Sequence, residues 1–120
     1  MSEAQRVEKP WGYELIWART DRYVGKLLHI REGHKLSLQY HRRKDETIFL
    51  QAGRMLFIFD EGQGLQQKEM QPGEAYHIRP LTKHRMVALT DCDIIEVSTP
   101  ELDDVVRLED AYGRAGTSTP

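Results

Sequence analysis

The sequence lacks a disulfide partner, a long apolar run and an excess of either charge. Cys92 is the only cysteine in 120 residues, so no internal disulfide can form and nothing favours an oxidising compartment. No segment approaches the roughly 18 apolar residues of a membrane span, and the N-terminal MSEAQRVEKP has no signal-like apolar stretch. With 17 basic and 19 acidic residues the formal charge is −2, which argues against nucleic-acid and membrane partners. We expect a soluble, cytoplasmic protein.

The length predicts a single domain over residues 1–120, because compact domains are typically about 100–150 residues long. We expect its core to span about 9–112. The last residues, 113–120 (GRAGTSTP), are small and polar, and we expect them to form a flexible tail.

Short segments of alternating apolar and polar residues predict an all-β fold. In 34–41, Leu36, Leu38 and Tyr40 point to one face of a strand, while Gln39 and His41 point to the other. The nearly continuous apolar run 54–60 predicts a buried strand, and the turn residues of 60–64 make it one arm of a hairpin with 65–71. Strands are also predicted at 11–18, 24–31, 74–79, 84–90 and 93–98.

The C-terminal region has a different pattern, which predicts a short helix. Thr99 can cap a helix, Pro100 suits its first turn, and Glu101 lies near the positive end of its dipole. Leu102 and the pair Val105–Val106 then follow at helical spacing, and Gly113 is a plausible end.

Four residues have the chemistry of a metal site: Gln39, His41, Glu46 and His84. A divalent metal requires three or four nitrogen and oxygen ligands that converge from different strands, with a position left for water or substrate. On spacing alone such a set is more often incidental than functional, so the sequence around it decides its interpretation.

That surrounding sequence resembles the cupin superfamily. The first cupin motif, G-x5-H-x-H-x3-4-E-x6-G, is matched by Gly33, Gln39, His41, Glu46 and Gly53, with Gln39 in place of the first histidine. The second motif is similar to PGEAYHIRPLTKH (72–84), in which a threonine stands where glycine is usual. The resemblance implies a conical β-barrel, also called a double-stranded β-helix or jelly roll, with the metal ligands inside it.

Within the cupins, the chain resembles the cupin domain of type II phosphomannose (mannose-6-phosphate) isomerases. LSLQYH (36–41) is similar to their LSLQ-x-H signature, and KPWGYE (9–14) to their R/K-P-W-G entry. HR at 84–85 and DDVVRLEDAYGR (103–114) also match that domain. The resemblance implies one divalent metal, zinc before iron, manganese or nickel, held by Gln39, His41, Glu46 and His84.

The reaction that this resemblance implies is a metal-assisted aldose–ketose isomerisation of a sugar or sugar phosphate. A general base must carry a proton between two carbons, and we expect Glu96 or His77 in that role. Lys44, Arg85 and Arg107 are the candidates to hold a phosphate. Two residues depart from the isomerase pattern: Lys44 replaces a common arginine, and Ile48 replaces an aromatic residue.

Two other functions remain open at this point. The same cavity could serve a non-catalytic sugar-binding or sensing module. An iron-dependent cupin dioxygenase is less favoured, because three histidines and one glutamate are the more usual iron ligands and Gln39 replaces one of them. We also expect a homodimer, formed through a sheet edge covered by the strand 11–18, which carries Trp11 and Trp17.

Overall fold

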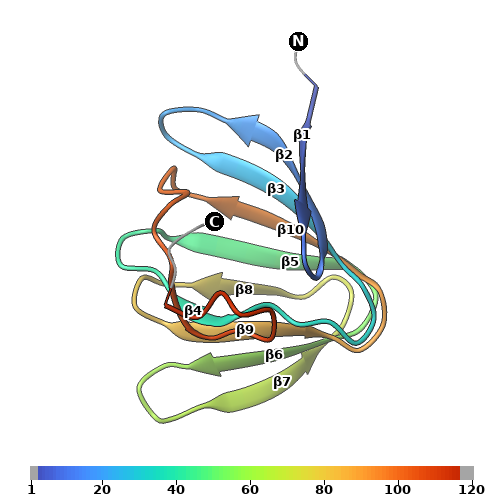
Figure 1. Ribbon diagram of the computed structural model, residues 1–120, viewed down its shortest axis with the longest axis vertical. Coiled ribbons are helices and arrows are strands. Elements are labelled where there is room, and N and C mark those ends of the chain that lie inside the picture. Colours follow the sequence, from blue (N-terminus) through green and yellow to red (C-terminus); the bar gives the residue numbers. More distant parts are fainter. Residues whose placement is uncertain (1–2, 117–120) are drawn as a thin grey trace.

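The computed structural model describes residues 3–116, and they form two antiparallel sheets that face each other (Figure 1). The six-stranded sheet has the order β1-β2-β3-β10-β5-β8, and the five-stranded sheet the order β11-β4-β9-β6-β7. The strands of the six-stranded sheet are β1 (Gln5–Lys9), β2 (Gly12–Arg19), β3 (Val24–Ile30), β10 (Cys92–Ser98), β5 (Glu46–Ala52) and β8 (Ala75–Ile78). The second sheet contains β11 (Val106–Glu109), β4 (Leu38–Tyr40), β9 (Lys83–Ala88), β6 (Met55–Asp60) and β7 (Gln66–Met70). The all-β prediction is confirmed.

Strand register produces the apolar core between the two sheets. Leu28 on β3, Ile94 on β10 and Leu50 on β5 are cross-strand neighbours on the inner face, and all three are buried. Phe57 and Met86 are direct partners on β6 and β9 and fill the other half of the core. Because side chains alternate along each strand, this register fixes which polar residues also point inward.

The predicted hairpin is present as β6 and β7, paired from Met55↔Met70 to Phe59↔Gln66. In its turn, the Asp60 carboxylate accepts hydrogen bonds from the backbone amides of Gly62 and Gly64. Gly53, the last glycine of the first cupin motif, has φ = 93°, and a Cβ there would lie 2.2 Å from the carbonyl oxygen of Asp91. A side chain is therefore excluded at this motif position.

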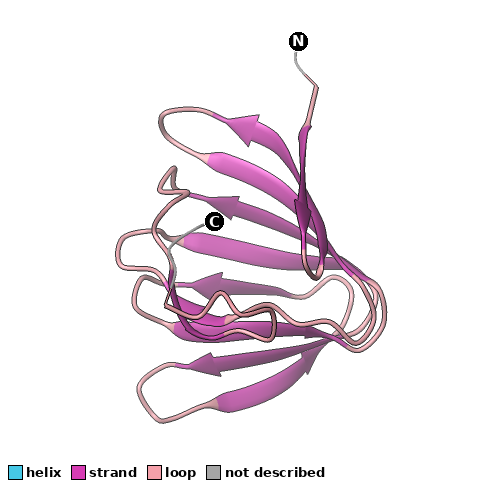
Figure 2. Ribbon diagram, viewed as in Figure 1, coloured by secondary structure: helices cyan, strands magenta, loops and turns pink. Residues whose placement is uncertain are grey.

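The prediction of a C-terminal helix is wrong. Residues 3–116 contain only strands, turns and loops (Figure 2). These residues therefore include no helix long and apolar enough to cross a membrane. Thr99 does not cap a helix but exchanges two hydrogen bonds with Asp45, both 3.0 Å long. β11 then pairs with β4, with Val106 opposite Tyr40 and Arg107 opposite Gln39. A helix of about ten residues is marginal by itself, whereas β-branched residues favour a strand edge that offers backbone partners.

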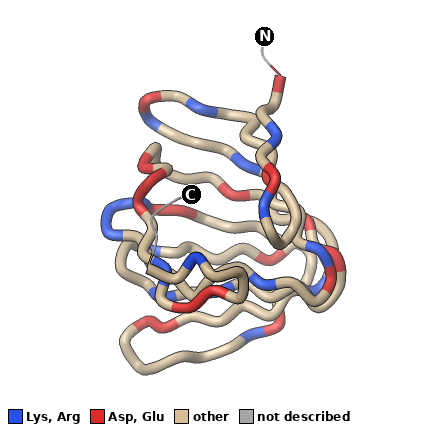
Figure 3. The backbone as a smooth tube through the Cα atoms, viewed as in Figure 1, with Lys and Arg blue, Asp and Glu red and all other residues tan. Residues whose placement is uncertain are grey.

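The C-terminal end of the described region stays attached to the barrel. The Gly116 amide donates a hydrogen bond to the carbonyl oxygen of Arg107, and the Arg114 side chain binds Asp110. Residues 117–120 of the expected flexible tail lie outside the described residues. Basic and acidic residues are interspersed over the fold (Figure 3), in agreement with the near-zero formal charge.

Candidate metal centre

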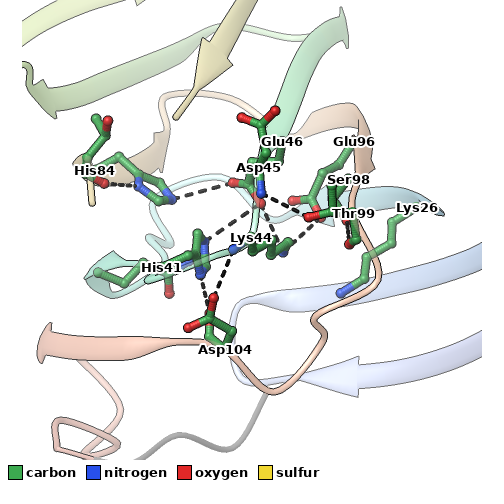
Figure 4. A network of polar contacts seen from close by, with 12 residues as sticks. Lys26, His41, Lys44, Asp45, Glu46, His84, Glu96, Ser98, Thr99 and Asp104 are labelled. Carbon is green, nitrogen blue, oxygen red and sulfur yellow. Dashed lines mark hydrogen bonds and ion pairs between the residues drawn. The ribbon is translucent and has the colours of Figure 1, made fainter. Parts of the chain in front are cut away.

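Three predicted metal ligands meet inside the barrel (Figure 4). His41 directly follows β4, Glu46 begins β5 and His84 lies on β9, and each is at most 3% exposed. The Glu46 carboxylate lies 3.7 Å from Nε2 of His41 and 3.5 Å from Nε2 of His84. One ligand atom from each residue falls within 4.8 Å of the others. The cluster therefore joins both sheets at one point.

Hydrogen bonds on the far side of each imidazole fix the orientation of both rings. Nδ1 of His41 lies 2.5 Å from the carbonyl oxygen of Asp104, and Nδ1 of His84 lies 2.8 Å from that of Thr82. A carbonyl oxygen can only accept, so each Nδ1 is the donor, and each Nε2 is the ring atom that faces Glu46. Burial lowers the pKa of His84 to about 4, which keeps that ring neutral.

The inward-facing imidazole nitrogens have no hydrogen-bond partner. His41 Nε2 and His84 Nε2 are fully buried and unbonded among the described residues, and both face the Glu46 carboxylate. Two lone pairs and a carboxylate that face one another repel unless a cation lies between them, and buried polar atoms normally find a partner. The donor set is thus suited to a divalent metal with nitrogen and oxygen ligands.

Lys44 supplies a positive charge beside this cluster. Its Nζ lies 2.9 Å from Oε2 of Glu46 and 3.4 Å from Oε2 of Glu96. Burial opposes the charge of Lys44, but Glu96 and Glu46 raise its pKa above the usual value. Burial also opposes the ionisation of Glu46, yet the adjacent Lys44 ammonium lowers the pKa of its carboxyl. The carboxylate is therefore ionised and ready to bind a cation.

Gln39, the fourth predicted ligand, is the cross-strand partner of His84 and lies between β9 and β11. Its Oε1 accepts a 2.6 Å hydrogen bond from the Ser37 hydroxyl. Gln39 and His41 line one cavity of about 60 Å³, which by volume has room for a few water molecules. Gln39 is thus beside the cluster but is engaged by a neighbouring hydroxyl.

Three of the other predicted site residues reach this cavity, and two do not. Glu96, Lys44 and Arg107 line it, and all three are buried. His77 is on the outer face of β8, where its Nε2 pairs with Asp45 at 2.6 Å. Arg85 alternates with the inward-facing His84 and donates hydrogen bonds to the carbonyl oxygens of Leu36 and Glu109 outside the barrel. The cavity therefore leaves His77 and Arg85 out.

Asp104 orients His41 and the loop 42–44 through hydrogen bonds. The sequence did not identify this residue, because it lies in the segment that was expected to be helical. Besides its carbonyl contact with His41, its carboxylate accepts hydrogen bonds from the backbone amides of Arg42, Arg43 and Lys44. The buried pair Glu14–Lys26 was also missed, since alternation shows that two residues share a face but not that a polar pair is buried there. The DDVVRLEDAYGR match was the only sequence signal near Asp104.

Comparison with known proteins identifies the family. The family described as mannose-6-phosphate isomerase, C-terminal, matches residues 1–110. The chain belongs to this family. The resemblance found from the sequence motifs is thereby confirmed, although no curated protein matches the chain.

Solved structures with the same fold are cupins. KdgF from Halomonas sp. is 24% identical with a TM-score of 0.71, over 82% of this chain and 88% of KdgF. CapF, a capsular polysaccharide assembling protein from Staphylococcus aureus, is 17% identical with a TM-score of 0.74, over 91% of this chain and 35% of CapF. Oxalate decarboxylase from Bacillus subtilis is 14% identical with a TM-score of 0.75, over 88% and 30%. This chain therefore corresponds to about a third of the last two proteins, and the similarities establish its cupin fold.

Proposed function

We propose that the chain is a metal-dependent cupin that isomerises a small sugar phosphate between its aldose and ketose forms. The observation that supports this most strongly is the buried cluster of His41, Glu46 and His84, in which both imidazole Nε2 atoms lack a hydrogen-bond partner. His41 borders a cavity that Lys44 and Glu96 also line. A bound divalent ion, most simply zinc, would polarise the carbonyl and hydroxyl oxygens on C1 and C2 of the sugar.

Glu96 is the general base in this proposal. Its carboxylate takes the proton from C2 of the aldose and returns it to C1, while a hydroxyl proton passes from O2 to O1. Substrate and product are isomers, so the reaction needs no further reactant. Lys44 lies 3.4 Å from Glu96 and orients that carboxylate, and His77 is not part of the mechanism because it points out of the barrel.

The route into the cavity passes Leu102. This residue lines both the internal cavity and an open cleft of about 590 Å³ that contains Arg19, Arg42 and Arg43. A sugar that reaches Glu96 must displace water from the cavity and pass Leu102. The segment before β11 that carries Leu102 therefore borders both spaces.

The test is a coupled assay of mannose 6-phosphate conversion to fructose 6-phosphate by the metal-loaded protein. Glu96→Gln should lower kcat by about 10²–10⁴-fold, the usual contribution of a general base, while metal content is unchanged. Glu69→Gln, which alters a partly exposed carboxylate on β7, is the matched control and should leave kcat unchanged. Failure to turn over any of several hexose phosphates with one metal bound would contradict the isomerase and favour a sugar-binding or sensing module.

We propose in addition that the protein forms a homodimer. Trp11 is buried against the cavity, but Trp17 is 52% exposed on the outer face of β2. Phe49 and Val97 are also exposed on the outer face of the same sheet, 39% and 48% respectively. Gel filtration with light scattering should give twice the 14.0 kDa chain mass, and a 14 kDa species would contradict a dimer.

A further inference from the structure

A second group of buried charges lines the cavity, on the wall formed by β1, β2, β3 and β11. Glu14 and Lys26 project from β2 and β3, and Lys9 ends β1. Arg107 lies on β11, and Arg114 follows in the segment after it. None of these side chains touches the three metal ligands in any ion pair or hydrogen bond recorded for the described residues. The group is thus separate from the metal cluster but lines the same cavity as His41.

The two lysines of this wall share one carboxylate. Nζ of Lys26 lies 3.3 Å from Oε1 of Glu14, and Nζ of Lys9 lies 4.0 Å from the same atom. All three side chains are more than nine-tenths buried, with 8–9% of their surface exposed. A buried charge is costly unless an opposite charge lies beside it. Two ammonium groups share the single carboxylate of Glu14, so a bound anion would balance the second positive charge.

Two guanidinium groups extend the positive wall. The side chain of Asp110 is fully buried and accepts two hydrogen bonds of 3.1 Å from the Arg114 guanidinium group. These bonds fix the position of Arg114 beside the cavity. Arg107 lines the same space opposite Gln39. Burial lowers the pKa of Lys9; Glu14 opposes this effect, while Lys26, Arg114 and Arg107 add to it, because like charges repel. All four cations line the same cavity.

The rest of the cavity suits the body of a small ligand. Trp11, Leu28 and Met86 are buried and supply apolar surface to the same cavity. A sugar ring packs well on such a surface, and its charged end then meets the positive wall. Five of the described residues lining the cavity are cationic and two are carboxylates.

We propose that Lys9, Lys26, Arg107 and Arg114 form an anion subsite for the phosphate or carboxylate group of the sugar whose reacting carbons face Glu96. This inference rests on the proposed function for the identity of the sugar, but the anion subsite itself can be tested without turnover. It assigns ligand-binding roles to Lys9, Lys26 and Arg114, and it orients the substrate with its charged end against β1–β3.

The test is isothermal titration calorimetry of the full-length, metal-free protein with inorganic phosphate and, separately, with acetate, at low ionic strength. One of the two anions should bind with a stoichiometry of one. Phosphate binding identifies a sugar phosphate as the ligand class, and acetate binding a sugar acid. Lys9→Met should weaken binding at least tenfold, and circular dichroism should confirm its fold, since Glu14 keeps its closer partner Lys26.

A second variant separates an anion subsite from a merely structural charge network. Glu14→Gln leaves every cation in place and removes the competing carboxylate, so anion binding should become several-fold tighter. A structural network predicts weaker binding or none. Lys68→Met, which removes an exposed cation on β7, should bind the anion within twofold of the wild type.

Two outcomes would overturn the inference. One is the absence of phosphate and acetate binding in a protein that binds metal and turns over mannose 6-phosphate, which would leave the proposed function intact. The other is binding that survives Lys9→Met and disappears in Arg43→Met, which would place the anion in the outer cleft. Anion binding with the expected variant pattern, but no isomerase turnover, would support the subsite and refute the isomerase.

Discussion

The backbone carbonyl oxygen of Asp104 accepts a 2.5 Å hydrogen bond from Nδ1 of His41. The carboxylate of the same residue accepts three more, of 2.6–3.0 Å, from the amides of 42–44. Burial alone would raise the pKa of the Asp104 carboxyl, but these amides lower it. Asp104, two residues before β11, thus orients a candidate metal ligand and shapes the loop that carries Lys44 to Glu46.

Asp104→Ala should therefore weaken metal binding without removing a ligand. The carbonyl contact remains, but the loop 42–44 loses its three hydrogen bonds, and we expect metal affinity to fall about 10–100-fold, as for other groups that orient metal ligands. Competition titration with a zinc chelator measures this. Asp103→Ala, at the exposed neighbouring position, is the control, and equal affinity in both variants would refute the role of Asp104.

Lys44→Met should destabilise the metal-free protein by about 3–5 kcal/mol, because it leaves the buried carboxylates Glu46 and Glu96 without their cation. Urea unfolding gives the change. Added zinc should stabilise this variant more than the wild type, since the ion takes over the charge balance of Glu46. Lys83→Met, exposed on β9, should have little effect. An equal response to zinc in the Lys44 variant and the wild type would contradict the charge coupling.

The fold and the clustering of His41, Glu46 and His84 were predictable because their signals are local or lie in motifs. The alternation around Gln39 and His41 set both side chains on one face, and Gly33 and Gly53 marked the turns. The segment 99–113 failed because capping residues and apolar spacing describe an isolated helix, whereas β4 offered Val106 and Arg107 a strand partner. The sequence alone could not show this long-range pairing.

The positive wall could not be predicted for a related reason. Lys9 and Lys26 lie on different strands of the same sheet. Only the register of β1, β2 and β3 brings their side chains to Glu14. His77 and Arg85 show the reverse case. Each lies on a strand that was predicted correctly, but next to an inward-facing neighbour, Ile78 or His84. Because side chains alternate along a strand, His77 and Arg85 point to the outer face and do not reach the cavity.

Gln39→Ala should lower metal affinity roughly tenfold, while a stoichiometry of one is retained, because the three clustered ligands remain. His41→Ala should instead abolish stoichiometric binding, since it removes one of the three. Gln67→Ala, exposed on β7, should behave like the wild type. Isothermal titration with zinc separates these cases, and wild-type affinity in Gln39→Ala would remove Gln39 from the ligand set.

Asp110→Asn should cost about 1.5–3 kcal/mol of stability at pH 7, through loss of charged hydrogen bonds to Arg114. Burial raises the pKa of the Asp110 carboxyl, but Arg114 and the amides of Arg114 and Tyr112 hold it below its usual 3.8. A carboxyl with a lowered folded-state pKa stabilises the fold above pH 3.8 and loses this effect in more acidic solution. The difference from wild type should shrink below pH 3.8, and a constant difference would contradict the ion pair. Asp21→Asn, in an exposed loop, is the control.

The central claim is that His41, Glu46 and His84 hold a divalent metal inside the barrel, and the most direct measurement is the metal content of wild type and Glu46→Gln. Both proteins should be purified without added metal, dialysed against the same trace zinc and analysed by plasma mass spectrometry. We predict about one equivalent in the wild type and less than a tenth in the variant, which keeps the shape of the side chain but loses its charge. Equal metal content in the two proteins, or none in the wild type, would contradict the claim.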